Sequence, residues 1–91
     1  MKYQWDKTKA SINKKRHGID FADAVGIFED EWALTLKEQI IHSEQRFVSI
    51  GIDFLCRIIV VVYAYRNDEI HIISARKATK NERKIYEQRR I

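Results

Sequence analysis

The sequence EIHIISARKATKNERKIYEQRR, residues 69–90, contains a strand, a group of cations and the start of a helix in immediate succession. Its first part is rich in isoleucine, which is typical of a buried strand. Thr79 and Glu82 then have the spacing of a capping box. In such a box the hydroxyl accepts a hydrogen bond from the first helical turn, and the carboxylate accepts one from the capping residue. A strand followed by a helix that begins near Lys80 is therefore expected.

The cations of this segment lie at the junction between the predicted strand and the predicted helix. Arg76 and Lys77 come just before the helix start, where free N–H groups and the helix dipole favour an anion. Residues 69–90 hold seven Lys or Arg against three Glu, whereas residues 1–68 hold ten charges of each sign. The segment therefore carries the whole net charge of +4. We interpret the junction as a phosphate-binding site.

The residues before this segment have the pattern of consecutive antiparallel strands. Apolar and polar side chains alternate over residues 32–37 and again over residues 46–51, as in half-buried strands. Residues 57–65 are apolar at almost every position and rich in β-branched side chains, which is typical of a central strand covered on both faces. Asn67 and Asp68 form the expected turn into the last strand.

Two helices are expected before the strands. Asp6 is the predicted N-cap of a basic helix that ends at Gly18, which lacks a Cβ and so suits the left-handed position after a helix. Asp20 caps a second helix with one apolar stripe. This stripe comprises Phe21, Ala24, Val25 and Phe28. Residues 3–5 can add a short edge strand. The sequence thus predicts an α+β fold with a single antiparallel sheet of roughly three to five strands, two N-terminal helices and one C-terminal helix.

Length and composition limit the possible architectures. A chain of 91 residues is expected to form one domain, residues 1–91, with little room for an enclosed cavity. The single cysteine, Cys56, excludes an internal disulfide and a cysteine zinc site, and its apolar surroundings predict a buried thiol. The sequence has no signal peptide and no membrane span, so a cytoplasmic protein without membrane association is expected.

Motifs of metal and cofactor enzymes are missing from the sequence. His17, His42 and His71 are not at ligand spacing with one another, and no paired Asp or Cys motif occurs. The glycines do not form a phosphate loop, and no serine stands in a nucleophile motif. The sequence therefore predicts no metal site and no cofactor.

The remaining polar residues suit metal-free RNA cleavage, in which a ribose 2′-hydroxyl attacks the neighbouring phosphate. Such a reaction needs cations that stabilise the developing charge, and a base and an acid for two oxygens. Glu44 and Arg46 share one face of their predicted strand. Arg83, Tyr86 and Arg90 share one stripe of the last helix. The plainer account is a surface pair of Glu44 with Arg46 and a Tyr86 that only packs the helix. The residues alone leave both accounts open.

A resemblance to a known family rests on residues 73–86. The run ISARKAT at residues 73–79, followed by Glu82, Arg83 and Tyr86, resembles the BrnT toxin family of bacterial type II toxin–antitoxin systems. Further markers stand in the family's order and spacing over nearly the whole chain. They are Trp5, Asp6, Asn13, His17, Gly18, Ile19, Phe21, Ala24, Phe28, Asp30, Arg46, Ile50, Gly51 and residues 60–62. Agreement of several motifs makes the resemblance specific.

The resemblance implies a RelE-like fold and a toxin that cleaves RNA and so inhibits translation. It also implies a cognate BrnA-like antitoxin with a ribbon-helix-helix DNA-binding region. The toxin–antitoxin complex would then regulate its own transcription at operator DNA, which it reaches through the antitoxin. RNA is the expected substrate, and the ribosome is a further candidate partner. A metal-independent endoribonuclease is expected; the alternative is a non-catalytic module that binds nucleic acid or a protein partner.

The same resemblance implies a set of site residues. The expected catalytic residues that match the family's motif are Arg46, Arg76, Glu82, Arg83 and Tyr86. Local chemistry adds Glu44 to this set, with His42 beside it. The neighbouring cations that are expected to bind RNA are Lys77, Lys80 and Arg90.

Overall fold

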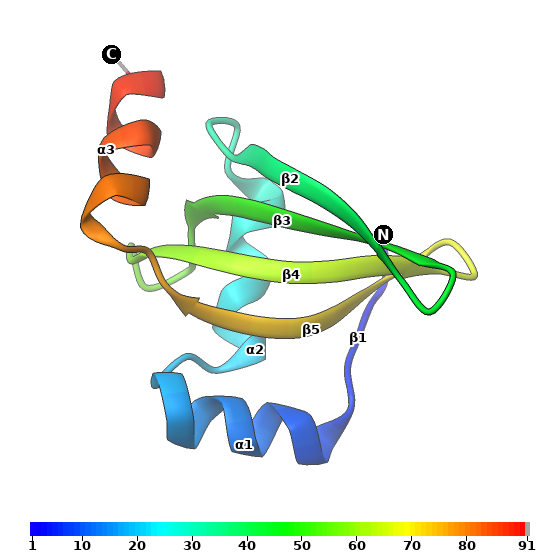
Figure 1. Cartoon of the computed structure of the whole chain (residues 1–91). Coiled ribbons are helices and arrows are strands. Elements are labelled where there is room, and N and C mark those ends of the chain that lie inside the picture. The colour runs from blue at the N-terminus through cyan, green and yellow to red at the C-terminus, as the bar shows by residue number, and fades with distance from the viewer. Residues whose placement is uncertain (91) are drawn as a thin grey trace.

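Five strands form one sheet in the order β1-β5-β4-β3-β2 (Figure 1). They are β1 (Tyr3–Gln4), β2 (Leu34–Ile41), β3 (Glu44–Ile52), β4 (Ile58–Arg66) and β5 (Glu69–Lys77). The computed structural model describes residues 1–90. Strands β2 to β5 pair antiparallel with their chain neighbours, whereas the two-residue β1 pairs parallel with β5 and makes the sheet mixed. The α+β fold with one sheet is confirmed.

Two-residue turns join the hairpins of this sheet. His42 and Ser43 connect β2 to β3 with φ angles of 51° and 64°, and Asn67 and Asp68 connect β4 to β5 with φ angles of 52° and 61°. A left-handed conformation at both turn residues matches the right-handed twist of the flanking strands. The predicted turn at residues 67–68 is confirmed, and β4 is the middle strand of the sheet, as its apolar sequence predicted.

The helices begin and end close to the predicted residues. They are α1 (Lys7–His17), α2 (Phe21–Ala24), the 3-10 helix η1 (Val25–Glu29) and α3 (Lys80–Arg89). Asp6 and Asp20 accept hydrogen bonds from the N–H groups of Lys9 and Ala22, over 3.0 and 3.2 Å, and Gly18 ends α1 with a φ of 71°. The second predicted helix is α-helical for only four residues and then narrows into η1. No helix within residues 1–90 is long and apolar enough to span a membrane.

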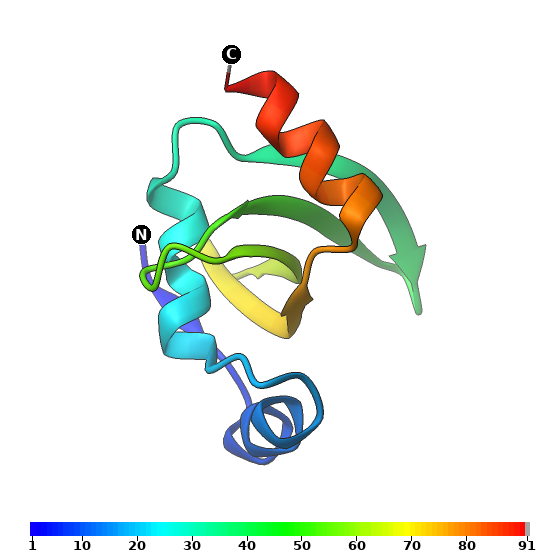
Figure 2. The same cartoon turned by 90° about the vertical axis from the view of Figure 1, so that its left-hand side faces the viewer.

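The helices cover the two faces of the sheet unequally. Helices α1 and α2 lie on one face, whereas α3 packs on the opposite face at one end of the strands (Figures 1 and 2). The buried core on the α1 and α2 face consists of Ile19, Phe21, Ala24, Ile27, Ile59, Val61, Tyr63, Ile70, Ile72 and Ala75. The core beneath α3 is smaller and consists of Val48, Ile50, Val60 and Tyr86. Beyond α3, the same face carries the charged side chains of Glu44, Arg46 and Arg66.

A buried asparagine fastens α1 to the sheet. Asn13 is 7% exposed, and its Nδ2 donates to the carbonyl oxygens of Ile19 (3.0 Å) and Ala75 (2.9 Å). Its Oδ1 accepts from the N–H of Ala75 over 3.1 Å. The two bonds to Ala75 satisfy backbone groups of β5 beyond the residues that pair with β1, and a buried polar group without partners would be costly. The contact fixes the end of α1 beside the end of β5.

The prediction that Cys56 is buried is wrong. Its side chain is exposed, and its φ of 63° places it at the bend between β3 and β4. The buried carboxylate of Asp53 holds this bend, because it accepts from the N–H groups of Leu55 and Arg57 over 3.0 and 2.8 Å. An Asp that bonds the backbone two and four residues on forms a tight loop. The loop turns its backbone inward and leaves the Cys56 thiol outside.

Candidate functional site

The end of β5 and the first turn of α3 form a rigid charged junction. Arg76 donates from Nη1 and Nη2 to the two carboxylate oxygens of Glu82, over 2.7 and 3.0 Å. Glu82 also accepts from the N–H of Thr79 (2.8 Å), and its own N–H donates to the Thr79 hydroxyl (3.2 Å). The predicted capping box is thus confirmed. The N-terminus of α3 already holds an anion, the Glu82 carboxylate, so the expected free anion site there is partly filled by the chain itself.

Arg76 and Glu82, both predicted to be catalytic, have different roles in this arrangement. The hydrogen bonds from Arg76, and then those from Thr79, lower the pKa of Glu82 to about 2. A carboxylate with so low a pKa is a weak base near neutral pH, because an efficient base has a pKa near the working pH. Arg76 keeps 41% of its side chain exposed, and the bond to Glu82 raises its pKa further. Glu82 is therefore placed to orient Arg76, whose guanidinium stays accessible.

We expect a loss of stability in acid that depends on Glu82. Its pKa lies near 2 in the folded chain against an ordinary value of 4.5, so the stabilisation is complete above pH 4.5 and is lost as the pH falls toward 2. The Glu82→Gln variant should lose less stability over this window. Urea unfolding at several pH values between these limits measures the difference. Equal slopes for the two proteins would contradict the assigned Arg76–Glu82 pair.

A pocket of about 370 Å³ opens at the same end of the sheet. Its lining consists of Cys56, Arg57, Ile58, Lys77, Ala78 and Arg83. Three of these residues are cations and none is a carboxylate. Lys77 and Arg83 form no ion pair with any residue from 1 to 90, and the same holds for Lys80 on the first turn of α3. The structure therefore brings the predicted residues Lys77 and Arg83 together and leaves their charges uncompensated.

A second charged cluster joins the ends of β3 and β4. Glu44 accepts from Nε and Nη2 of Arg66 over 2.6 and 2.8 Å, and from Nε of Arg46 over 3.3 Å. The bonds from Arg66, and then that from Arg46, lower the pKa of Glu44 to about 2. The predicted pair of Glu44 with Arg46 exists, but Arg66, which the sequence did not single out, is the closer partner. Only the pairing of β3 with β4 brings Arg66 there.

The two clusters share a face of the sheet but do not meet. Arg76 lies opposite Val60, and Val60 lies opposite Ile50. Arg46 comes four residues before Ile50 on β3, so it lies about 13 Å away from the Arg76 row along the strands. In this structure the Arg46 guanidinium is bonded to Glu44 and the Arg76 guanidinium to Glu82, so each arginine is held at its own end of the strands. The sequence places Arg46 and Arg76 together among the expected catalytic residues. The fold does not bring these two arginines into one cluster.

The side chain of Tyr86 lies in the core beneath α3. Its side chain is fully buried, and its hydroxyl donates to Oδ2 of Asp30 over 2.5 Å. Burial, and then the bond to this carboxylate, raises the pKa of Tyr86 to about 12. Arg90, another predicted RNA-binding residue, lies over the Tyr86 ring with its Cζ 5.8 Å from the ring centre. The geometry fits the plainer account of Tyr86, which is to hold α3 on the sheet.

His71, which the sequence did not predict as a site residue, lies near the second cluster. It lies opposite Ala64, which in turn lies opposite Arg46, so His71 and Arg46 flank a small side chain on the α3 face of the sheet. Its Nε2 is 3.8 Å from the Glu69 carboxylate. His42, in contrast, is exposed in the β2–β3 turn. Sheet register alone identifies the position of His71, because no local motif surrounds it.

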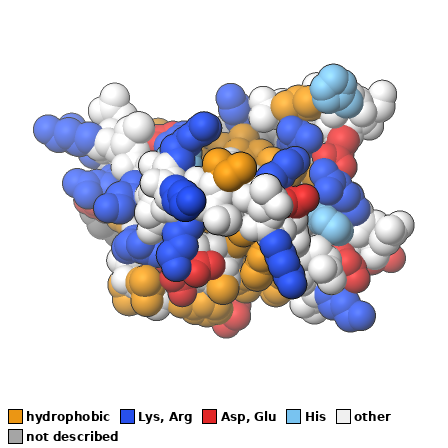
Figure 3. Space-filling model, turned by 90° about the horizontal axis from the view of Figure 1, so that it is seen from below, with side chains coloured by type: hydrophobic (Ala, Val, Ile, Leu, Met, Phe, Trp, Pro, Cys, Tyr) orange, Lys and Arg blue, Asp and Glu red, His pale blue; other side chains and the backbone are white. Residues whose placement is uncertain are grey.

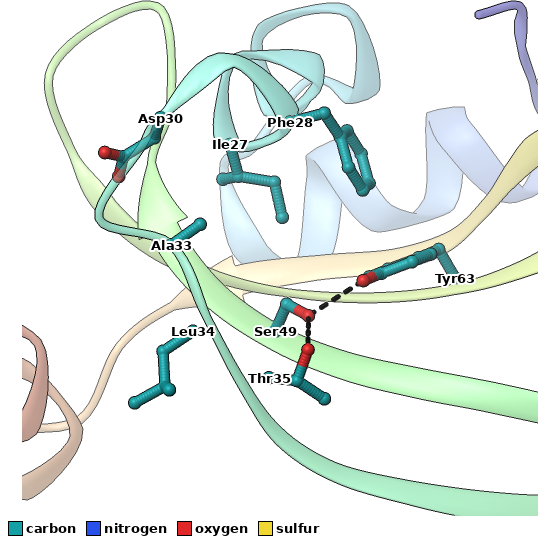
Figure 4. A pocket seen from close by; sticks show the side chains of 8 residues that line it. All are labelled: Ile27, Phe28, Asp30, Ala33, Leu34, Thr35, Ser49 and Tyr63. Atoms are coloured by element: carbon teal, nitrogen blue, oxygen red, sulfur yellow. Dashed lines mark hydrogen bonds between the residues drawn. The ribbon is translucent and has the colours of Figure 1, made fainter.

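A smaller pocket of about 210 Å³ lies between η1 and the sheet (Figure 4). The hydroxyl of Ser49 is 3.3 Å from that of Thr35 and 2.9 Å from that of Tyr63, so three strands contribute to one hydrogen-bonded chain. Ser49 and Tyr63 are nearly buried, and the bonds satisfy polar groups that burial would otherwise penalise. This pocket contains no cation and gives no sign of an anion site.

Basic side chains also cover the underside of the molecule. In the view from below, with α1 nearest the viewer, Lys and Arg side chains are more frequent than carboxylates (Figure 3). The last turn of α1 alone contributes Lys14, Lys15, Arg16 and His17.

Within the described residues, no three His, Cys, Asp or Glu side chains gather as a metal site would require.

Comparisons with known proteins agree on one family. A family model described as "Ribonuclease toxin, BrnT, of type II toxin-antitoxin system" matches residues 5–82. The crystal structure of the Brucella abortus ribonuclease toxin BrnT is similar, with a TM-score of 0.65 and 28% sequence identity. The match covers 88% of this chain and 99% of that toxin. No curated protein sequence matches the chain.

Proposed function

The chain belongs to the BrnT family of ribonuclease toxins of type II toxin–antitoxin systems, and from this we propose that it cleaves RNA without a metal ion at the junction of β5 and α3. In the proposed reaction a ribose 2′-hydroxyl attacks the adjacent phosphate, the bond to the 5′-oxygen of the next nucleotide breaks, and a 2′,3′-cyclic phosphate results. The nucleophile belongs to the RNA. The protein supplies charge, orientation and proton transfer.

The observation that carries this proposal is a fixed arginine beside unpaired cations. Glu82 holds the Arg76 guanidinium through two hydrogen bonds, so Arg76 need not reorganise when charge develops on the phosphate. Lys77 and Arg83 border the neighbouring pocket and have no ion pair within residues 1–90. We assign charge stabilisation to Arg76 and RNA binding to Lys77, Lys80 and Arg83. Glu82 and Tyr86 act as positioning residues.

The cluster of Glu44, Arg46 and Arg66 has a different place in this proposal. It lies about 13 Å from the Arg76 row along the strands, so it can meet a part of the RNA other than the phosphate at Arg76. His71 shares its face of the sheet. We assign this cluster to contacts with RNA beyond the cleaved bond.

Cleavage should continue in EDTA and leave a 2′,3′-cyclic phosphate on the 5′ fragment. The reason is that the attacking group is the 2′-hydroxyl, so no bound ion is needed to activate water. Mass spectrometry of the products of a short RNA identifies the end group, and an RNA with a single 2′-deoxyribose at the cut site should resist cleavage. Loss of activity in EDTA that Mg²⁺ restores, or a product with a 5′-phosphate, would refute the proposed chemistry.

We further propose that RNA cleavage in the cytoplasm inhibits translation and that a BrnA-like antitoxin neutralises the toxin by covering the junction. The cations of the junction that form no ion pair within residues 1–90 suit an acidic or amphipathic antitoxin segment; they are Lys77, Lys80 and Arg83. A ribbon-helix-helix dimer of the antitoxin would join two toxins and carry the complex to operator DNA, where it regulates transcription. The ribosome remains a candidate site of cleavage.

Adding the antitoxin should abolish cleavage and protect Lys77 and Lys80 from acetylation by a water-soluble reagent. A stable complex of this kind should bury roughly 1,200 Å² or more in total. Lysines of α1, such as Lys7 and Lys9, serve as the comparison, because they lie on the opposite side of the sheet. Inhibition with Lys77 and Lys80 still fully reactive would show that the antitoxin acts elsewhere.

A non-catalytic binding module is the second candidate. One observation favours it: Arg46 and Arg76 are each paired with a carboxylate, as in a surface whose charges serve only to hold a partner. Induction of the lone chain in a bacterial host separates the candidates. Growth arrest with fragmented RNA supports the ribonuclease, whereas normal growth with abundant soluble protein supports the binding module.

A further inference from the structure

We propose that the pocket at the ends of β4 and β5 holds one nucleotide of single-stranded RNA, with its base against Arg57 and Ile58 and its phosphate at Lys77 and Arg83. The proposal rests on the proposed ribonuclease function and adds to it a site that contacts a base and thereby selects the RNA. Three separate pieces of chain build this site. The β3–β4 loop contributes Arg57, the end of β5 contributes Lys77, and α3 contributes Arg83.

The three cations of the pocket differ in whether a carboxylate of the protein neutralises them. Nε of Arg57 donates to Oδ2 of Asp53 over 2.9 Å, and its Nη2 is 2.8 Å from the same oxygen. Its Nη1 donates to the carbonyl oxygen of Gly18 over 3.2 Å. Arg57 is therefore held in one orientation with its charge balanced. Lys77 and Arg83 are exposed and form no ion pair within residues 1–90.

This division matches the two parts of a nucleotide. A guanidinium plane that is already fixed and neutralised is a poor phosphate ligand but a good surface for stacking a base, as proteins use it for unstacked RNA bases. Ile58 and Ala78 add an apolar wall beside it. Free Lys and Arg side chains are the usual phosphate partners. A pocket of about 370 Å³ is of the size that takes a small organic group, and it exceeds what a phosphate alone requires.

The shape of the site also selects the form of the RNA. A base can enter a pocket only when it is not stacked and paired inside a helix, so the pocket favours single strands over duplexes. The carboxylates of an acidic peptide would satisfy Lys77 and Arg83, but they would bring no flat group to the wall of Arg57 and Ile58. Recognition of a base is therefore the occupancy that uses every part of the lining.

Cys56 allows the pocket to be tested without a mutation, because the only thiol of the chain lies in its lining and is exposed. The full chain is treated with iodoacetamide, a small neutral reagent, with and without a 2′-O-methyl RNA hexamer that cannot be cleaved. At a hexamer concentration about ten times its Kd, mass action predicts that alkylation slows about tenfold. A duplex of the same sequence, inorganic phosphate and an abasic oligonucleotide of the same length should give little protection.

Two exchanges and a matched control locate the phosphate. Lys77→Gln and Arg83→Gln should each weaken protection by the hexamer and lower the salt dependence of binding by about one charge. Lys84→Gln removes a neighbouring exposed cation of α3 that does not line the pocket, and it should leave protection unchanged. All three side chains are exposed, so the fold is expected to be retained; thermal unfolding checks this.

Each outcome distinguishes this proposal from the proposed function. Equal protection by the abasic oligonucleotide or by phosphate would reduce the site to a simple anion site and overturn the base pocket. RNA cleavage that proceeds while the hexamer binds and leaves Cys56 unprotected would place the bound RNA elsewhere, with the ribonuclease function intact. A chain that neither binds nor cleaves RNA, and whose Cys56 only the antitoxin protects, would contradict both.

Discussion

Replacing Arg76 by alanine is expected to lower the rate of RNA cleavage by roughly 10², the usual effect of losing one fixed electrostatic donor from a reacting centre. The loss should appear in kcat more than in KM, because charge on the phosphate develops only in the transition state. Single-turnover cleavage of a short RNA measures it directly. In a bacterial host the Arg76→Ala chain should no longer arrest growth, although it accumulates to the same level.

Two further variants separate charge stabilisation from a structural role of Arg76. Arg76→Lys keeps the charge but cannot bond both Glu82 oxygens, so it should recover only part of the activity. Glu82→Gln keeps the shape of the partner, and its effect on the rate should be smaller than that of Arg76→Ala. If Arg76 served only to hold α3, the rate loss of each variant would follow its loss of stability. An unchanged rate in folded Arg76→Ala would remove Arg76 from the site.

Replacing Tyr86 by alanine is expected to have the largest effect on stability. The side chain is fully buried in the small core beneath α3, and truncation of a buried aromatic ring costs about 3–5 kcal/mol. It also removes the hydroxyl that donates to Asp30, which otherwise ties α3 to the end of η1. Denaturant unfolding measures the free energy of unfolding, and α3 should lose its protection from amide exchange first.

Tyr86→Phe decides whether the hydroxyl has a chemical role as well. It removes one hydrogen bond to a carboxylate, which costs about 1.5–3 kcal/mol, and keeps the ring in place. Asp30 retains the N–H groups of Trp32 and Ile52 as donors, over 2.9 Å each. Folded Tyr86→Phe should cleave RNA at nearly the normal rate. A large loss of activity without a loss of stability would return Tyr86 to the catalytic residues.

Features that depend on neighbouring residues could be predicted from the sequence. The caps at Asp6, Asp20 and Thr79 are confirmed because each side chain bonds an N–H only two or three residues away. The turn at residues 67–68 and the central position of β4 are confirmed for a similar reason, since turn geometry and the pattern of burial are properties of short runs. Cys56 is the exception, because the Asp53 loop overrides the apolar pattern on either side of it.

The partner of each charged side chain was decided only by the tertiary structure. Glu44 bonds Arg66, which lies 22 residues further along the chain, and Asp30 bonds Tyr86, which lies 56 residues further. Among residues 1–90, Arg57 has an ion-pair partner and Lys77 has none, and this depends on which residue another strand or loop brings within about 3 Å. Sequence spacing fixes which side chains share one element, whereas strand register and loop closure fix which elements meet. The cations of the junction were therefore visible in residues 69–90, but the pairing of Arg76 with Glu82 and the approach of Arg57 from the β3–β4 loop were not.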